Sequence, residues 1–223
     1  MKKKPQHSLN TDKIVRVDPS APDSDAIRKA AGILQQKGVL VFPTSGLYGL
    51  AADAFSSEAV DRVFAIKRRP ADRPVLVMLA GIHDLERMVQ CVPDFAEPLM
   101  ELWPGGITLI FEAAASVPAA LTGGTGTIGV RLPAHPVARA LVRQFGGPIT
   151  ATSANLSGCP SVSAAADLDP RICADVDMVL DGGILAGGTG STVVDASHWP
   201  VRIIRVGAVS RQAIEAVLAK RSA

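Results

Sequence analysis

The sequence predicts an α/β fold: a single domain on one twisted sheet of mixed parallel and antiparallel strands, with flanking helices. Helical and strand-like patterns alternate along most of the chain, which is typical of α/β architecture. Three late strand segments follow one another without a helix between them, which favours some antiparallel pairing. A length of 223 residues without a linker-like segment fits one large domain. We expect residues 1–20 to be a flexible N-terminus and residues 21–223 to form this domain.

The first half of the chain begins with an amphipathic helix. Residues 24–38 place apolar side chains at helical spacing, with Ser24 as the cap and Gly38 as the stop. A second helix follows a cap at Ser56 or Ser57 and ends at the next proline. The other elements expected here are strands at 39–42 and 74–80 and short helices at 83–90 and 93–103.

The second half supplies most of the predicted strands. The segment "PITATSAN" (148–155) begins as a strand and ends in a polar turn, and the last helix, 210–223, is capped by Ser210. The other elements expected are strands at 107–113, 127–133, 178–183, 191–197 and 201–207 and a helix at 135–146.

The composition argues against several functional classes. Aromatic residues make up only 4% of the chain, which disfavours recognition of nucleic acid by base stacking. The formal net charge of +2 does not by itself imply a polyanionic partner. The three cysteines are widely spaced and form no metal-ligand or disulfide pattern. No signal-peptide core follows the basic start, and no apolar run approaches the ~20 residues of a membrane span. We therefore expect a cytoplasmic protein without a membrane partner.

The segment "VFPTSGLYGLAADAF" (41–55) ends an apolar run with a proline, hydroxyl residues and glycines. It is too irregular to continue a strand and too rich in small residues for a packing helix. We interpret it as a loop that carries the hydroxyl groups of Thr44, Ser45 and Tyr48.

A basic cluster, "KRRPADRP" (67–74), ends the second predicted helix. Such residues are often solvated cations that interact favourably with the helix dipole. If the helix breaks at the following proline, however, Lys67 and Arg69 can converge on one polyanion. A point charge beside a bidentate fork suits a chain of phosphates.

Hydroxyl and amide side chains cluster in "TATSANLSGCPS" (150–161), directly after a predicted strand. Ser153 and Asn155 would face one side of an extended chain. One interpretation is structural: the Ser and Asn side chains cap the loop by hydrogen-bonding to its own backbone. Ligands of open α/β sheets, however, gather beyond the carboxyl ends of strands, which favours phosphate or ribose recognition here.

The glycine-rich segment "GGTGSTVVDA" (187–196) also suits an anion, since glycines let backbone N–H groups approach it. It is neither a Walker A loop nor a dinucleotide fingerprint, because no lysine follows the glycines and the segment opens onto a strand. The turn in "LWPGGITLIFEA" (102–113) has a mainly structural interpretation.

The sequence offers no general base. It contains no GxSxG or HExxH motif, and His83, His135 and His198 have no catalytic partner by spacing. The predicted site therefore binds and orients anions, and would act by positioning and charge stabilisation.

Seven segments together resemble the YrdC/Sua5 family, the L-threonylcarbamoyladenylate synthases. They occur in the order "FPTSGLYGLAADAF", "IKRRPADRPVLVML", "LWPGGITLIF", "TIGVRLPAHPVARAL", "PITATSANLSGCPS", "STVVD" and "IIRVGA". The resemblance covers residues 24–210 and is specific, because the order and spacing agree. It implies the YrdC-like fold with a basic concave cleft, in the short form of a single domain.

The resemblance implies a nucleotidyltransferase that makes threonylcarbamoyl-AMP and pyrophosphate from ATP, bicarbonate and L-threonine. The product would serve the threonylcarbamoyl modification of adenosine 37 in tRNA. Mg²⁺ is inferred from the chemistry of ATP. tRNA and proteins of the tRNA-modification pathway are the implied partners beside the small-molecule substrates.

The resemblance also carries roles onto residues of this sequence. The residues matched to the family's KxR and SxN motifs, which would bind and polarise the ATP phosphates as the catalytic set, are Lys67, Arg69, Ser153 and Asn155. The further positions matched to nucleotide contacts are Arg73, Thr127, Ser161 and Arg205. The positions matched to the amino-acid substrate are Thr44, Tyr48, Arg131 and Ser191.

Two positions depart from the family's pattern, and both lie on the amino-acid side. Gly46 stands where the family usually has a second threonine, and Met78 where it usually has a histidine. Each change removes a polar partner, and the loss of such partners weakens discrimination between substrates. The nucleotide side of the family's pattern is intact.

Two alternatives stay open at this level. One is a paralogue that forms a carbamoyl- or acyl-adenylate on another acceptor. The other is a non-catalytic module that binds double-stranded RNA or tRNA on a basic concave surface. The Lys67/Arg69 and Ser153/Asn155 pairs favour an enzyme, because RNA binding alone would not require them.

Overall fold

The structure is a computed structural model that describes residues 11–220, and its strands form two sheets rather than the single sheet expected. The five-stranded sheet has the order β1-β9-β2-β3-β8, and the six-stranded sheet the order β11-β10-β5-β6-β4-β7. The strands are β1 (Ile14–Arg16), β2 (Leu40–Pro43), β3 (Tyr48–Ala51), β4 (Val77–Met78), β5 (Ile107–Glu112), β6 (Thr127–Arg131), β7 (Ile149–Thr150), β8 (Thr152–Ser153), β9 (Met178–Asp181), β10 (Thr192–Asp195) and β11 (Arg202–Arg205).

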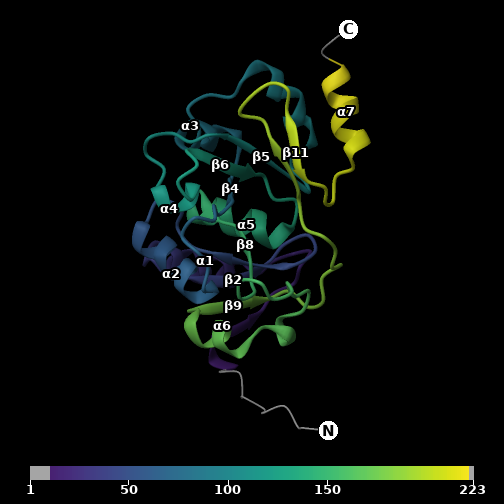
Figure 1. Cartoon of the computed structure of the whole chain (residues 1–223). Helices are drawn as coiled ribbons and strands as arrows, with labels where there is room; N and C mark the ends of the chain where they lie inside the picture. Colours follow the sequence, from purple (N-terminus) through teal and green to yellow (C-terminus); the bar gives the residue numbers. More distant parts are fainter. Residues whose placement is uncertain (1–10, 221–223) are drawn as a thin grey trace.

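Both sheets mix parallel and antiparallel pairs, which confirms that part of the prediction. In the five-stranded sheet, β9 pairs in parallel with β1 and β2, whereas β3 runs antiparallel to β2 and β8. In the six-stranded sheet, β10 with β5 and β4 with β6 are the parallel pairs. Figure 1 shows β2 and β9 in the lower half of the molecule, and β4, β5, β6 and β11 in the upper half.

Helices cover both faces of the five-stranded sheet. One apolar cluster joins α1 and α5 to alternate residues of β2 and β9, and a second joins α2 and α6 to the other face. The helices are α1 (Ser24–Gln35), α2 (Ser57–Lys67), α3 (Leu85–Met88), α4 (Ala119–Thr122), α5 (Pro136–Phe145), α6 (Pro170–Asp175) and α7 (Arg211–Ala219), with 3₁₀ turns η1 (Thr11–Lys13), η2 (Ile82–Asp84), η3 (Asp94–Leu102) and η4 (Ala165–Asp167).

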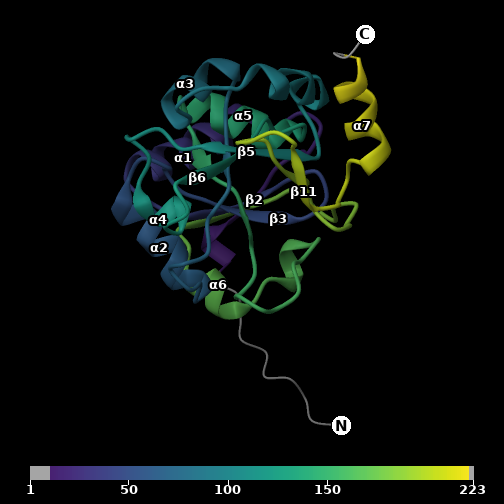
Figure 2. The ribbon, with the colours of Figure 1, turned by 45° about the horizontal axis from the view of Figure 1, so that its top comes forward.

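Strands β5, β6 and β10 of the six-stranded sheet pack on one face, whereas Met78 of β4 and Ile149 of β7 join the cluster of α1 and α5 on the other. Leu109 and Phe111 of β5 and Val130 of β6 point into a third cluster that includes residues of η3 and α7. The alternate residues Thr108 and Ile110 point to the opposite face, because successive side chains of a strand alternate. Figure 2 shows α7 at the outside of the molecule beside β11. The part of the opposite face that the helices leave open is available for a ligand.

A single residue joins the two sheets. β7 belongs to the six-stranded sheet and β8 to the five-stranded sheet, and only Ala151 separates them. The backbone N–H of Ala151 donates to the carbonyl of Leu76 at 2.7 Å, and that of Thr150 donates to the carbonyl of Ala52 at 2.9 Å. The segment 148–155, predicted to begin as a strand and end in a polar turn, is therefore split between the two sheets.

The structure corrects the interpretation of 41–55 as a loop. Residues 48–51 form β3, which hydrogen-bonds to β2 on one side and to β8 on the other. Small residues fit here for a packing reason, since a Cβ on Gly49 would lie 3.1 Å from the Phe42 ring. Only residues 44–47 are the connection, closed by a hydrogen bond from the Thr44 N–H to the Leu47 carbonyl.

Other boundaries also differ from the predictions. The first helix is capped by the Asp23 carboxylate rather than by Ser24, whereas Ser56 and Ser210 cap α2 and α7 as predicted. The strand expected at 74–80 is paired only at β4. Because β1 pairs with β9, the fold begins before residue 21, and residues 1–10 of the expected flexible N-terminus lie outside the described residues.

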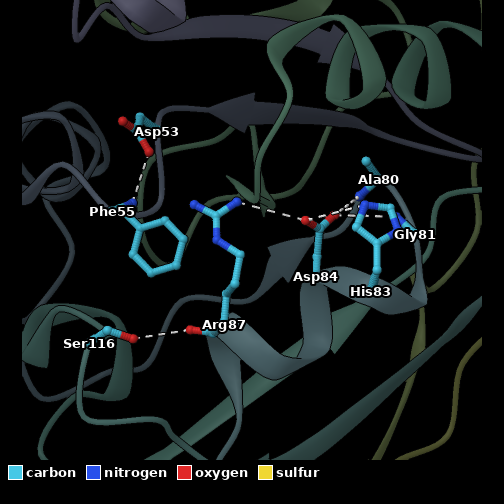
Figure 3. A network of polar contacts seen from close by, with 8 residues as sticks. All are labelled: Asp53, Phe55, Ala80, Gly81, His83, Asp84, Arg87 and Ser116. Carbon is cyan, nitrogen blue, oxygen red and sulfur yellow. Dashed lines mark hydrogen bonds and ion pairs between the residues drawn. The ribbon is translucent and has the colours of Figure 1, made fainter.

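A buried carboxylate organises the turn after β4 (Figure 3). Asp84 accepts hydrogen bonds from the backbone N–H groups of Ala80 (2.8 Å) and Gly81 (3.3 Å), which caps η2. Its other oxygen lies 3.9 Å from the Arg87 guanidinium, which in turn lies over the Phe55 ring at 4.8 Å. This network ties the start of α3 to the segment before α2. Within residues 11–220 no helix has the length and apolarity needed to cross a membrane.

Candidate functional site

A cleft of about 670 Å³ lies on the partly open face of the six-stranded sheet. Its walls are the turn 44–47 between β2 and β3, the residues at the β7–β8 joint, and residues 187–191 of the segment between β9 and β10. Both sheets therefore contribute to one concave site, as the sequence predicted for the segments around 44, 153 and 191.

The floor of the cleft is a row of side chains across the sheet. Strand pairing places Met78 opposite Arg131, and Val193 opposite both Thr108 and Arg205. Because Leu109 pairs with Val130, the next residues along, Thr108 and Arg131, project from the other face of these two strands. Residues that lie opposite each other in a sheet project from the same face. Two cations, Arg131 and Arg205, thus flank a buried threonine and a valine.

Arg131 is a half-buried cation that forms no ion pair with a carboxylate of residues 11–220. Its Nε is buried and has no hydrogen-bond partner among the described residues. Burial lowers the pKa of this guanidinium, and the nearby charge of Arg205 lowers it further. Because an unpaired, partly buried cation is unfavourable, this position favours an anionic ligand.

Arg205 is held in place by the segment 182–191. Its Nη2 donates to the carbonyl oxygen of Ser191 at 2.8 Å, and its Nε donates to the same oxygen at 3.2 Å. The Ser191 hydroxyl is buried and lies 2.9 Å from the hydroxyl of Thr108. Ser191 therefore orients Arg205 and the floor of the cleft together.

Arg69 enters the cleft from the end of α2. Arg68 ends this helix in the left-handed region, with φ of 50°, a conformation that is unfavourable for a residue with a Cβ. The turn brings Arg69 to the cleft, where Nη2 donates to the Pro74 carbonyl at 2.7 Å. Burial, and then the charge of Arg73, lower the pKa of Arg69.

The three arginines give the cleft its charge. No aspartate or glutamate is among its described lining residues. Within residues 11–220, none of the three forms an ion pair with a carboxylate. Guanidinium groups so placed raise the local concentration of anions and bind them bidentately.

Lys67 lies behind the cleft rather than in it. Its side chain is buried, and its ammonium donates to the backbone carbonyls of Ser153 and Asn155 (2.8 Å to Asn155). The Asn155 Oδ1 lies 3.5 Å away. Burial lowers the pKa of Lys67 to about 8, with a further contribution from Arg69. In this conformation Lys67 holds the turn that follows β8.

That turn presents Ser153 to the cleft. The Ser153 hydroxyl hydrogen-bonds to Oδ1 of Asn155, whose Nδ2 donates to the carbonyls of Leu156 (2.9 Å) and Cys159 (2.6 Å). Ser153 is one of the lining residues, whereas Asn155 supports the turn from outside the lining. The predicted KxR and SxN pairs are thus in contact.

Tyr48 lines the cleft, but its hydroxyl is engaged within the fold. Its side chain is fully buried, and its hydroxyl donates to the carbonyl of Gly183 at 2.7 Å and accepts from the N–H of Gly182 at 3.0 Å. Asp181 Oδ1 lies 3.2 Å from the same hydroxyl. Burial, and next the charge of Asp181, raise the pKa of Tyr48, which therefore stays protonated. The hydroxyl is occupied by the fold, and Thr44 likewise donates to the Leu47 carbonyl at 2.6 Å.

The structure brings most of the predicted site residues to one cleft. Those among the lining residues are Thr44, Tyr48, Arg69, Arg131, Ser153, Ser161, Ser191 and Arg205. Arg73 is exposed outside the lining. Thr127 lies at the opposite end of β6 from Arg131, with its hydroxyl 3.0 Å from that of Thr125. The roles assigned to these residues stay predictions.

Sequence reasoning missed several residues in and beneath the cleft. Thr108 does not line the cleft but is buried beneath its floor, where its hydroxyl meets that of Ser191; its polar side chain within an apolar strand is the signal that could have found it. Thr152 and Thr189 stand in motifs already singled out and do line the cleft. The side of the floor nearest Met78 is apolar, with Leu76 and Ile110 beside it.

Gly46 also has a structural explanation. A Cβ at this position would overlap the carbonyl oxygen of Gly187. The space that a threonine side chain would need is therefore filled by the backbone of another cleft wall. Within residues 11–220, no group of three or more His, Cys, Asp or Glu side chains could hold a metal ion.

The family model Sua5_yciO_yrdC, described as "Telomere recombination", matches residues 32–207. The chain belongs to this family. The matched region contains both sheets apart from β1, and every wall of the cleft.

Several curated relatives carry one name, threonylcarbamoyl-AMP synthase. The Pyrococcus abyssi protein is 38% identical over 193 residues, which cover 86% of this chain and 57% of that protein. The Bacillus subtilis protein is 38% identical over 214 residues, which cover 93% and 59%. The Xanthomonas campestris protein (strain B100) is 37% identical over 196 residues, which cover 86% and 99%. The chain thus spans less than three fifths of the first two relatives and nearly all of the third.

Solved structures of the family share the fold. P. abyssi Sua5, described in complex with L-threonine, has a TM-score of 0.85 and 36% identity, over 92% of this chain and 60% of that one. Escherichia coli YciO has a TM-score of 0.82 and 26% identity, over 90% and 98%. The α/β class and the family resemblance are confirmed.

Proposed function

We propose that this chain is a threonylcarbamoyl-AMP synthase that uses ATP, bicarbonate and L-threonine and releases pyrophosphate. One observation carries the proposal: Arg69, Arg131 and Arg205 meet in a single cleft that has no carboxylate among its described lining residues. Such a cleft suits two anionic substrates at once, a triphosphate and an amino-acid carboxylate. The names of the relatives and the L-threonine bound to P. abyssi Sua5 support the choice of reaction.

The residues fit an adenylation reaction. The threonine amine and bicarbonate form a carbamate with loss of water; a carbamate oxygen then attacks the α-phosphate, and pyrophosphate leaves. Arg69 and Ser153 would bind the phosphates, and Arg131 the amino-acid carboxylate, since its buried Nε has no hydrogen-bond partner among residues 11–220. Aligning the reactants and neutralising the phosphates supplies most of the acceleration in reactions of this kind.

Mg²⁺ would arrive with ATP. The described lining offers hydroxyl oxygens but no carboxylate, so the phosphates would supply most of the metal's ligands. We also propose, from the family resemblance, that the product serves threonylcarbamoylation of adenosine 37 in tRNA. The protein's contribution to catalysis is then a fixed set of cations around the reacting groups.

The test is an assay of the purified chain with ATP, Mg²⁺, bicarbonate and each amino acid in turn. Pyrophosphate and the adenylate are both measured. We expect pyrophosphate release that depends on threonine. Release with another acceptor would show a related enzyme with a different substrate. No release with any acceptor, together with salt-sensitive binding of RNA, would reject the enzymatic function.

A matched pair of variants tests the cleft itself. Arg69→Ala should lower kcat/KM for ATP on the order of 100-fold, because a charge-assisted contact to phosphate is lost. Arg68→Ala changes the neighbouring cation, which is exposed and does not line the cleft. The kcat/KM of this variant for ATP should stay within about twofold of the wild-type value. Equal effects of the two changes would contradict the assignment.

A further inference from the structure

Two backbone segments touch at the rim of the cleft. Gly46 lies in the turn between β2 and β3, and Gly187 in the segment between β9 and β10. The N–H of Gly187 donates to the carbonyl oxygen of Gly46 at 2.9 Å. Both glycines line the cleft, so their contact closes part of its rim.

Gly46 is required by space and not by backbone torsion. Gly187, Gly188 and Gly190 have positive φ values of 74°, 107° and 78°, whereas Gly46 is not in the left-handed region. A Cβ on Gly46 would overlap the carbonyl oxygen of Gly187. Because the obstructing atom belongs to the backbone, no rotation of a side chain can make room. A larger residue at position 46 must displace the segment around Gly187.

The other end of this segment is fixed separately. The Gly190 carbonyl accepts from the Ala208 N–H at 2.9 Å, and the Ser191 carbonyl accepts from Arg205. A Cβ on Gly207 would lie 2.5 Å from the Gly190 carbonyl oxygen, so the two chains are tightly packed there. Between these ends, Gly188 and Thr189 are exposed and line the cleft. The rim segment 187–190 is therefore held at two points, and Gly46 is one of them.

We propose that Gly46 is a positioning residue that seats the rim segment 187–190 over the cleft and thereby sets how tightly the substrates are held. The inference rests on the proposed function and adds a residue to it. It also says how the site would change if position 46 carried a side chain. A threonine here would not add a hydroxyl partner to the site, because its Cβ would first push the rim segment away.

Gly46→Ala and Gly46→Thr test the proposal, with Gly32→Ala as the matched control. Gly32 lies in α1, and a Cβ there would meet no atom within 4 Å. Backbone hydrogen exchange of residues 186–190 should become roughly tenfold faster in both Gly46 variants and stay unchanged in the control. The KM for ATP or threonine should rise roughly tenfold while kcat changes less than about threefold.

Three results would separate the possible failures. Wild-type exchange at 186–190 in both Gly46 variants would overturn the positioning role, whatever the activity. A fall in kcat at unchanged KM would also overturn it, because the rim would then not control binding. If the wild-type chain releases no pyrophosphate, the proposed function fails. The exchange data, with calorimetric titration of ATP into each variant, still decide the role of Gly46.

Discussion

The Lys67 ammonium lies 2.8 Å from the carbonyl oxygen of Asn155, which joins two motifs that are 88 residues apart in the sequence. It also contacts the carbonyl of Ser153. One side chain from the end of α2 thus holds the turn that presents a hydroxyl to the cleft. A cation with three donors suits this task, since backbone carbonyls are its natural partners.

The buried Lys67 should make both activity and stability depend on pH above 7. Its pKa is about 8 in the folded chain, against 10.5 for the free side chain. Between these values the unfolded state binds more protons than the folded state, so stability rises with pH. Turnover should fall in the same range, because a neutral amine holds the Ser153 turn less firmly. A pH–rate profile and denaturant unfolding at pH 7 and pH 10 measure the two trends.

Lys67→Met serves as the reference for this titration. Between pH 7 and pH 10, the free energy of unfolding of the wild type should rise by about 1–3 kcal/mol more than that of the variant. A wild-type pH–rate profile that is flat through pH 9.5 would show that the charge of Lys67 does not support the turn.

Arg131→Met should separate function from stability. The change removes a half-buried cation whose Nε has no partner among residues 11–220 and which faces the charge of Arg205. We expect the free energy of unfolding to stay constant or to rise by about 1–2 kcal/mol. The KM for the amino acid should rise on the order of 100-fold. Thermal unfolding and steady-state kinetics test both; a marked loss of stability would show that Arg131 has a structural partner.

Tyr48→Phe should cost stability with little effect on the amino-acid substrate. The variant leaves the Gly182 N–H and the Gly183 carbonyl without their partner, at a cost of about 1–3 kcal/mol. Because the hydroxyl is occupied within the fold, the KM for the amino acid should change less than about threefold. A large rise in this KM at unchanged stability would restore the hypothesis that Tyr48 contacts the substrate.

Asp84→Ala should destabilise the turn after β4. Two backbone N–H groups lose their acceptor, which should lower the free energy of unfolding by about 1–3 kcal/mol. Glu86→Ala is the control, since Glu86 is exposed in the same turn, and should stay within about 0.5 kcal/mol. The network lies outside the cleft lining, so activity per folded molecule should not change. Equal stability of both variants would contradict the capping role.

Local patterns predicted much of the fold, because caps and apolar spacing act over a few residues. Ser56 and Ser210 cap the helices expected of them, and the strands around Leu109 and Val130 lie where alternation placed them. The division into two sheets was missed because it depends on pairing between distant segments. β3 was missed because Gly49 and Ala51 have low strand propensity, and only burial between β2 and β8 makes them a strand.

The sequence predicted which residues form the site better than it predicted where their side chains point. The arginines and Ser153 reach the cleft, and their charge and hydrogen-bonding capacity are visible in the sequence. The burial of Lys67 and of the Tyr48 hydroxyl could not be read from the sequence, because each depends on carbonyls far along the chain. The close approach of Gly187 to Gly46 is likewise a contact between backbones, for which a sequence has no side-chain signal.

The joint at Ala151 has a mechanical consequence. With one residue between β7 and β8, and with hydrogen bonds from Ala151 to Leu76 and from Thr150 to Ala52, the two sheets cannot swing apart at the base of the cleft without breaking strand pairing. The β7–β8 joint therefore holds the two sheets in a fixed arrangement at this point. Any movement that widens the cleft would thus occur at its rim, where turn 44–47 meets segment 187–190. Such a movement would break the hydrogen bond between Gly187 and Gly46, a contact between two backbones that carry no side chain.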